Sequence, residues 1–136
     1  MSMSKAFEIA GTALAANSQR LNAVASNLAN AESVSGPDGQ VYQARKVVFE
    51  SYLMEGADAG GQGVRVREVV TDPAPGKLIY QPNHPMANEE GYIMMPNVEV
   101  VDEMVDMIAA SRAYQTNVEI MNTTKTLMQK TLTLGT

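Results

Sequence analysis

The sequence has no cysteine and no tryptophan, and only two of its 136 residues are phenylalanine. A chain without cysteine has no disulfide framework, no thiolate metal site and no cysteine nucleophile. Aromatic residues make up only 5% of the chain, and Ala, Val and Met supply much of the apolar content. We therefore expect a single domain, or a small domain with extended elements, that has a thin hydrophobic core.

Positive charge is scarce as well, because ten Lys and Arg face fifteen Asp and Glu, for a net charge of −5. This balance argues against a nucleic-acid partner, since such proteins neutralise phosphates with basic side chains. No run of about 18 apolar residues is present, so we expect no bilayer-spanning helix. Glu8, Thr12 and Asn17 interrupt the apolar segment near the N-terminus, which argues against a cleavable signal peptide.

Residues that carry chemistry are few. The one histidine, His84, stands between Asn83 and Pro85, and a lone loop histidine is more often a surface group than a catalyst. The glycine-rich segment 60–63 lacks the Lys and Ser or Thr of a phosphate-binding loop. We expect no enzymatic activity, no metal, no cofactor and no small-molecule substrate.

One acidic cluster leaves an alternative open. It contains Glu99, Asp102, Glu103 and Asp106, at the expected start of a helix, where carboxylates favour the positive end of the macrodipole. We expect this cluster to be solvated. A small carboxylate-dependent hydrolase is the alternative that rests on it.

The first thirty residues predict a helix from about Ser4 to Asn30. Large apolar residues recur every seven positions, and smaller ones follow three positions later, which is typical of an apolar stripe: Phe7, Leu14, Leu21 and Leu28, then Ala10, Val24 and Ala31. Between Thr12 and Ala31 the only charged side chain is Arg20. Such a helix is suited to packing against several neighbours, although a plain alanine-rich helix would share these features.

A second helix is predicted from about Glu99 to Thr133, with a methionine-rich seam at spacings of three and four. The seam contains Met104, Met107, Ser111, Tyr114, Val118, Met121, Lys125, Met128 and Leu132. Two helices of this kind pair with each other, or with copies of themselves, as a coiled coil. Because the seam continues almost to the last residue, we expect Leu132 and Leu134 to be buried against the N-terminal helix of the same or of a neighbouring subunit.

The intervening segment is rich in glycine and proline and favours short strands. We expect them at about residues 41–53, 64–67, 78–80 and 92–95, with a flexible loop near 56–63. The predicted fold class is therefore α+β and mainly helical, with a small β-hairpin-rich segment between the long helices. The predicted division is an N-terminal axial helix at 1–31, the middle segment at 32–97 and a C-terminal axial helix at 98–136.

Two segments make the sequence specific. Residues 21–31 read LNAVASNLANA and strongly resemble the N-terminal signature of the bacterial flagellar rod and hook protein family, with Ser26 to Asn30 at its core. Residues 103–108 and 113–117 look like the other terminal motif of this family. Segments 36–39, 84–92, 96–98 and 130–135 resemble a proximal-rod member, and the short length excludes the longer distal-rod and hook relatives.

The resemblance implies a non-enzymatic axial subunit that is exported by the flagellar type III apparatus and polymerises helically in the periplasm. It would transmit torque and form part of the export channel wall in the proximal rod. The implied partners are other copies of the chain, neighbouring proximal and distal rod proteins, membrane-ring or export-gate adaptor proteins and the export apparatus.

The assembly interface is expected to use residues from both terminal helices, and we expect sixteen of them to take part: Phe7, Leu14, Leu21, Val24, Ser26, Asn27, Leu28, Asn30, Met104, Met107, Tyr114, Asn117, Val118, Met121, Met128 and Leu132. A small helical adaptor or secretion chaperone is the main alternative function. Such a protein would also be small and acidic, but it should form a stable soluble dimer by itself.

Overall fold

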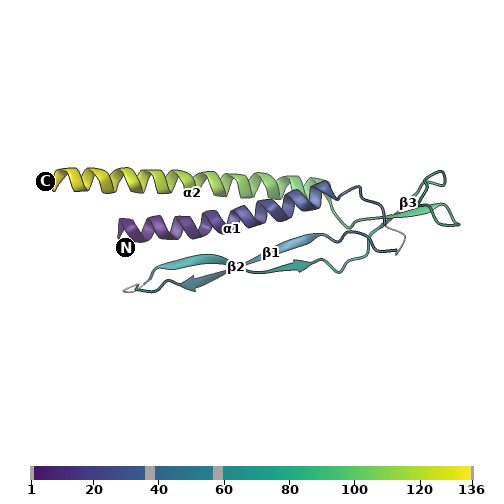
Figure 1. Ribbon diagram of the computed structural model, residues 1–136, viewed down its shortest axis with the longest axis horizontal. Coiled ribbons are helices and arrows are strands. Elements are labelled where there is room, and N and C mark those ends of the chain that lie inside the picture. The colour runs from purple at the N-terminus through teal and green to yellow at the C-terminus, as the bar shows by residue number, and fades with distance from the viewer. Residues whose placement is uncertain (1, 36–38, 57–59, 136) are drawn as a thin grey trace.

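The computed structural model describes residues 2–35, 39–56 and 60–135. In chain order its elements are helix α1 (Met3–Ala29), strands β1 (Arg45–Leu53), β2 (Gln62–Thr71), β3 (Lys77–Tyr80) and β4 (Tyr92–Met95), and helix α2 (Val100–Leu134). The molecule is elongated, and α1 lies between α2 and the β1–β2 hairpin (Figure 1). The β3–β4 hairpin projects beyond the end where α1 stops and α2 begins.

The predicted fold class is confirmed, with two long helices flanking an antiparallel β segment. The helix bounds lie within one residue of the predicted ones. The hydroxyl of Ser2 caps α1 by accepting from the Lys5 backbone N–H at 3.1 Å. At the other end of α1, the side chain of Asn30 donates to the Ser26 carbonyl at 2.9 Å. The centre of the predicted loop near 56–63 lies outside the described residues, as does most of segment 36–39.

The strands form two separate antiparallel hairpins. β1 pairs with β2 from Arg45 opposite Thr71 to Leu53 opposite Gln62, with an irregularity between Val48 and Phe49. β3 pairs with β4, and the rings of Tyr80 and Tyr92 meet edge to face at 5.2 Å. The first strand begins at Arg45 and not near residue 41, because side chains from other elements bind the backbone at its start. The second strand is longer than predicted.

The hairpin packs closely on α1. The Thr12 hydroxyl accepts from the Val64 backbone N–H at 3.1 Å. A Cβ added at Gly63 would lie 3.2 Å from the same hydroxyl, so glycine permits this close approach. The β1–β2 hairpin therefore forms the outer layer on the side of α1 opposite to α2.

The core is thin, as predicted. Its buried apolar residues are mostly small: Ala10, Ala16, Val24, Ala44, Ile93, Val98 and Ala110. Much of the large apolar surface remains outside, including Val101, Ile108 and Leu127. The isolated chain therefore exposes apolar surface that monomeric proteins usually bury.

The seam of α2 agrees with the prediction at six of nine positions. Met107, Ser111, Tyr114, Val118, Met121 and Met128 are half-buried, whereas Met104, Lys125 and Leu132 are exposed. The fully buried residues of the helix are Glu103, Ala110 and Thr124, each one position before a predicted seam residue. Met104 is 54% exposed. Small Ala110 and Thr124 let the helices approach closely, whereas larger apolar side chains face outward.

The C-terminal end of α2 is not buried within the single chain, so its burial against a neighbouring subunit stays a prediction. Helix α2 continues past the first residue of α1 (Figure 1). Leu132 and Leu134 are therefore 72% and 88% exposed. Among the described residues none buries these two leucines, because α1 ends short of them.

Candidate assembly surfaces

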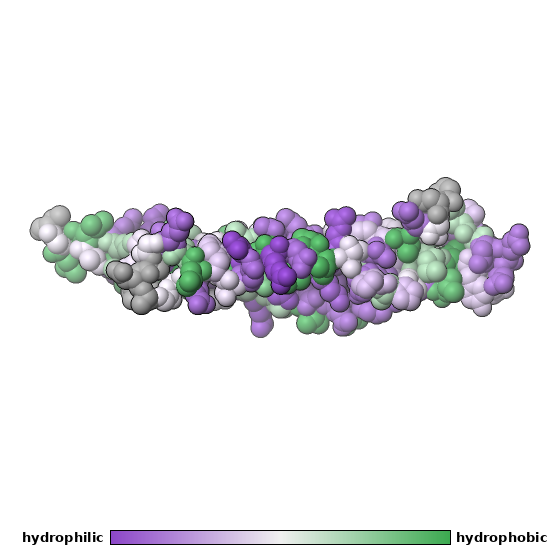
Figure 2. Space-filling view, turned by 90° about the horizontal axis from the view of Figure 1, so that it is seen from below, coloured by the Kyte–Doolittle hydropathy of each residue, from purple (hydrophilic) through white to green (hydrophobic). Residues whose placement is uncertain are grey.

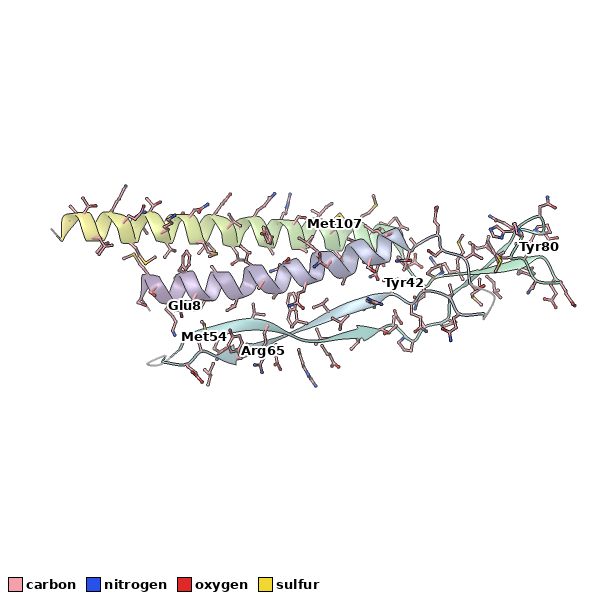
Figure 3. The ribbon with its side chains drawn as sticks, viewed as in Figure 1. Glu8, Tyr42, Met54, Arg65, Tyr80 and Met107 are labelled. Atoms are coloured by element: carbon pink, nitrogen blue, oxygen red, sulfur yellow. The ribbon has the colours of Figure 1, made fainter. Side chains whose placement is uncertain are left out.

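Asn27 is the centre of a buried hydrogen-bond network at the junction of α1 and β1. It is 1% exposed. Its Nδ2 donates to the Arg45 carbonyl at 2.9 Å, and its Oδ1 accepts from the Arg45 N–H at 2.9 Å and from the Tyr42 hydroxyl at 2.8 Å. Figure 3 shows Tyr42 at this junction, where its hydroxyl also lies 3.0 Å from the Ser26 hydroxyl. The Ser26–Asn27 motif thus fixes β1 on α1.

Asn97 completes the same junction from the other end of the chain. Its Oδ1 accepts from the Ala44 N–H at 2.8 Å, and its Nδ2 donates to the carbonyls of Ala74 and Asp72 at 2.9 and 3.2 Å. Two asparagine side chains therefore hold the adjacent residues Ala44 and Arg45. The sequence reasoning did not select Asn97 as a site residue, because a single asparagine before a helix has no spacing signal.

The structure places most of the predicted interface residues between elements of the same chain. On α1, Phe7, Leu14, Leu21 and Leu28 are half-buried and Val24 is buried. On α2, Met107, Tyr114, Asn117, Val118, Met121 and Met128 are half-buried, whereas Met104 and Leu132 are exposed. The half-buried residues keep some accessible surface. Their contact with neighbouring subunits remains a prediction.

Helix α2 has exposed apolar side chains outside its contact with α1, and the predicted interface included only Met104 among them. They form two groups, one near each end of the helix: Val101, Met104, Val105 and Ile108, then Ile120, Leu127 and Leu134. Hydrophobic side chains also gather at the C-terminal end of the molecule (Figure 2). These residues form a second apolar pattern in the sequence, at positions other than those of the half-buried Met107, Met121 and Met128.

The acidic cluster is only partly solvated, which corrects the expectation for Glu103. This residue is 8% exposed, and its Oε2 has no hydrogen-bond partner. Asp106 forms an ion pair with Arg20 at 3.4 Å, and Glu99 pairs with Lys77 at 2.7 Å. Glu103 faces the side of α2 that packs on α1, because it occupies a seam position.

Asp72 lies near this cluster and stabilises the turn after β2. Its carboxylate accepts from the Ala74 backbone N–H at 2.9 Å and lies 3.4 Å from the Lys46 ammonium. The Ala74 hydrogen bond and, to a smaller extent, Lys46 hold the pKa of Asp72 below its usual value of 3.8, although partial burial acts in the opposite direction.

Two protein families match the N-terminal and C-terminal segments of the chain. Residues 7–37 match the family described as flagella basal body rod protein, and residues 89–134 match the C-terminal family of the flagellar basal body rod FlgEFG proteins. The FlgC rod protein of Yersinia enterocolitica is 58% identical over 99% of both chains. Those of Escherichia coli and Salmonella typhimurium are 56% and 55% identical over the same share. The chain belongs to the family of flagellar basal-body rod proteins.

The two matched rod-family segments contain nearly all of α1 and α2. They include Asn27 and Asn97, which join the helical layers to β1. The β1–β2 hairpin lies between the two matched segments.

The part of the chain that the structure describes has neither a metal-binding cluster nor a membrane-spanning helix. Among residues 2–35, 39–56 and 60–135, no group of three or more His, Cys, Asp or Glu side chains is arranged to hold a metal ion. Within the same ranges, neither helix has the apolar length needed to cross a membrane.

Proposed function

We propose that the chain is a structural subunit of the rod of the bacterial flagellar basal body. The identity of 55–58% over 99% of FlgC rod proteins carries this proposal. The exposed apolar side chains of α2 support it, because a subunit that assembles must leave part of its apolar surface uncovered. The adaptor or chaperone alternative has no such support.

The finer part of the proposal concerns how the subunit works. It polymerises helically through its terminal helices in the proximal rod, within the periplasm, after export through the flagellar type III apparatus. Its partners are further copies, neighbouring proximal and distal rod proteins and membrane-ring or export-gate adaptors. Residues 1–31 and 98–136 act as the axial helices that form the channel wall and transmit torque, and residues 32–97 cover them.

The test is motility of a strain that lacks the gene, complemented with variants. Leu21→Asp is expected to abolish rod assembly and swimming, because it places an unpaired charge among half-buried apolar side chains. His84→Ala is the control and should swim normally, since His84 only accepts the Met86 N–H within its own loop. Normal swimming of the deletion strain would refute the proposed function.

A further inference from the structure

An acidic groove lies between the first turns of α2 and the start of β1. It has a volume of about 400 Å³, and its acidic lining residues are Asp72, Glu99, Asp102, Glu103 and Asp106. Val101 and Val105 lie in the same turns of α2 and are 72% and 59% exposed. The groove therefore combines carboxylates with accessible apolar surface.

Two of these carboxylates have no cation in the described part of the chain. Asp72, Glu99 and Asp106 are paired with Lys46, Lys77 and Arg20, but Asp102 and Glu103 form no ion pair. The helix dipole accounts for an acidic residue at Asp102. It does not account for Glu103, because burying a carboxylate oxygen without a donor is costly. Glu103 therefore leaves one buried carboxylate oxygen without a hydrogen-bond partner beside the groove.

The opposite end of α2 has the complementary chemistry. Lys125 and Lys130 are exposed and form no ion pair within the described residues, and Leu127, Leu132 and Leu134 lie beside them with 48–88% exposure. A lysine ammonium offers three donors on a long flexible stem. The end of α2 thus carries positive charge and leucines, whereas the groove is lined mostly by carboxylates, with Lys46 and Val105 beside them.

We propose that the C-terminal end of α2 in one copy docks against the acidic groove of a second copy. This inference rests on the proposed function as a rod subunit and assigns the surfaces that meet. Asp102 and Lys130 are separated by about 42 Å along α2, at 1.5 Å per residue, so one chain cannot make the contact with itself. Because the two surfaces differ, the contact is head to tail and can continue through a polymer.

Cysteine cross-linking tests the contact directly, since the native chain has no cysteine. The full-length double variant Asp102→Cys/Lys130→Cys, produced in cells that build rods, is expected to form intermolecular disulfides under mild oxidation. The matched control is Glu89→Cys/Lys130→Cys, which moves one cysteine to an exposed acidic position in the β3–β4 loop. We expect at least tenfold more dimer from the first pair. Equal cross-linking, or none, would overturn the proposal.

Charge reversal provides the second measurement. Asp102→Lys and Lys130→Glu should each reduce the yield of assembled rods at least tenfold, whereas the combination should restore it, because the charges are again opposite. Both positions are exposed, so the fold should tolerate the changes. Full assembly of each single variant would refute this contact. If Leu21→Asp does not block assembly, the proposed assembly through the terminal helices is refuted instead. The two experiments therefore test the contact and the proposed function separately.

Discussion

At the scale of single residues, buried asparagine side chains hold the elements together, a role that large apolar residues have in most small domains. Asn27 is among the largest fully buried side chains of the protein, together with Ile93 and Pro96. Each of its polar groups has a partner, so its burial does not leave an unsatisfied group. The junction of α1, β1 and α2 is therefore specified by hydrogen-bond geometry.

Replacing Asn27 tests this role. Asn27→Ala removes the partners of the Arg45 N–H, the Arg45 carbonyl and the Tyr42 hydroxyl, and each buried unsatisfied group costs about 1–3 kcal/mol. We expect a loss of at least about 2 kcal/mol in the free energy of unfolding, measured with urea. Asn22→Ala is the matched control, because Asn22 is exposed on the same helix. Equal effects of the two changes would show that the network is not stabilising.

Asp72 gives a prediction for acid conditions. Its pKa is lower in the folded chain than its usual value of 3.8, so the carboxylate stabilises the fold above that pH. This contribution is lost as the pH falls below about 4, through the folded-state pKa. The stability difference between wild type and Asp72→Asn should therefore narrow on acidification, as measured by urea unfolding between pH 5 and 2.5. A difference that does not change with pH would contradict this assignment.

At the scale of elements, α2 has two functions on two faces. The inner face uses methionines alternating with small or polar residues to pack on α1, and the flexible methionine side chains adapt to an irregular neighbour. The outer face carries Val101, Ile108 and Leu127, which nothing in the described chain covers. The distribution of large residues indicates that α2 makes its larger apolar contacts with other subunits.

Truncation of α2 separates folding from assembly. Deleting residues 131–136 removes Leu132 and Leu134, which are exposed in the single chain, so the free energy of unfolding should change little. In the polymer each leucine would contribute about 1.5–3 kcal/mol if buried. We expect a protein that is exported but does not support distal-rod growth, seen as cells with membrane rings and no hooks. Hooks and swimming at wild-type speed would refute burial of this end.

At the scale of the whole molecule, three thin layers joined at one end make a subunit that is incomplete by itself. The asparagine network lies where α1 ends and α2 begins, while the other end of α2 extends past the first residue of α1 (Figure 1). Isolated helices are marginal in water, and most helical stability comes from packing. We therefore expect α1 and α2 to be less stably folded the farther their residues lie from this junction.

Amide hydrogen exchange of the dilute monomer measures this decline. We expect the strongest protection next to Asn27 and Asn97 and rapid exchange in the first two turns of α1 and beyond Met121 in α2. Assembly into the rod should slow exchange at both helix ends, because neighbouring subunits would then cover them. Strong, uniform protection of residues 10–28 in the monomer would contradict this expectation.

The sequence by itself determined the two long helices, their bounds and the intervening hairpins. These features depend on local periodicity and turn residues, which act over a few positions. It also determined the family, since the terminal motifs around Asn27 and Met107 are contiguous segments. The thin core followed from the scarcity of aromatic residues.

Only the tertiary structure decided which side chains at the start of α2 are inside. Positions 103 and 104 differ by one residue, and periodicity favoured the more apolar Met104. The packing of α1 on α2 instead buries Glu103 and leaves Met104 outside. The structure also decided the role of Asn97, because its partners at Ala44, Asp72 and Ala74 are distant in sequence, and no local pattern encodes a hydrogen bond between distant segments.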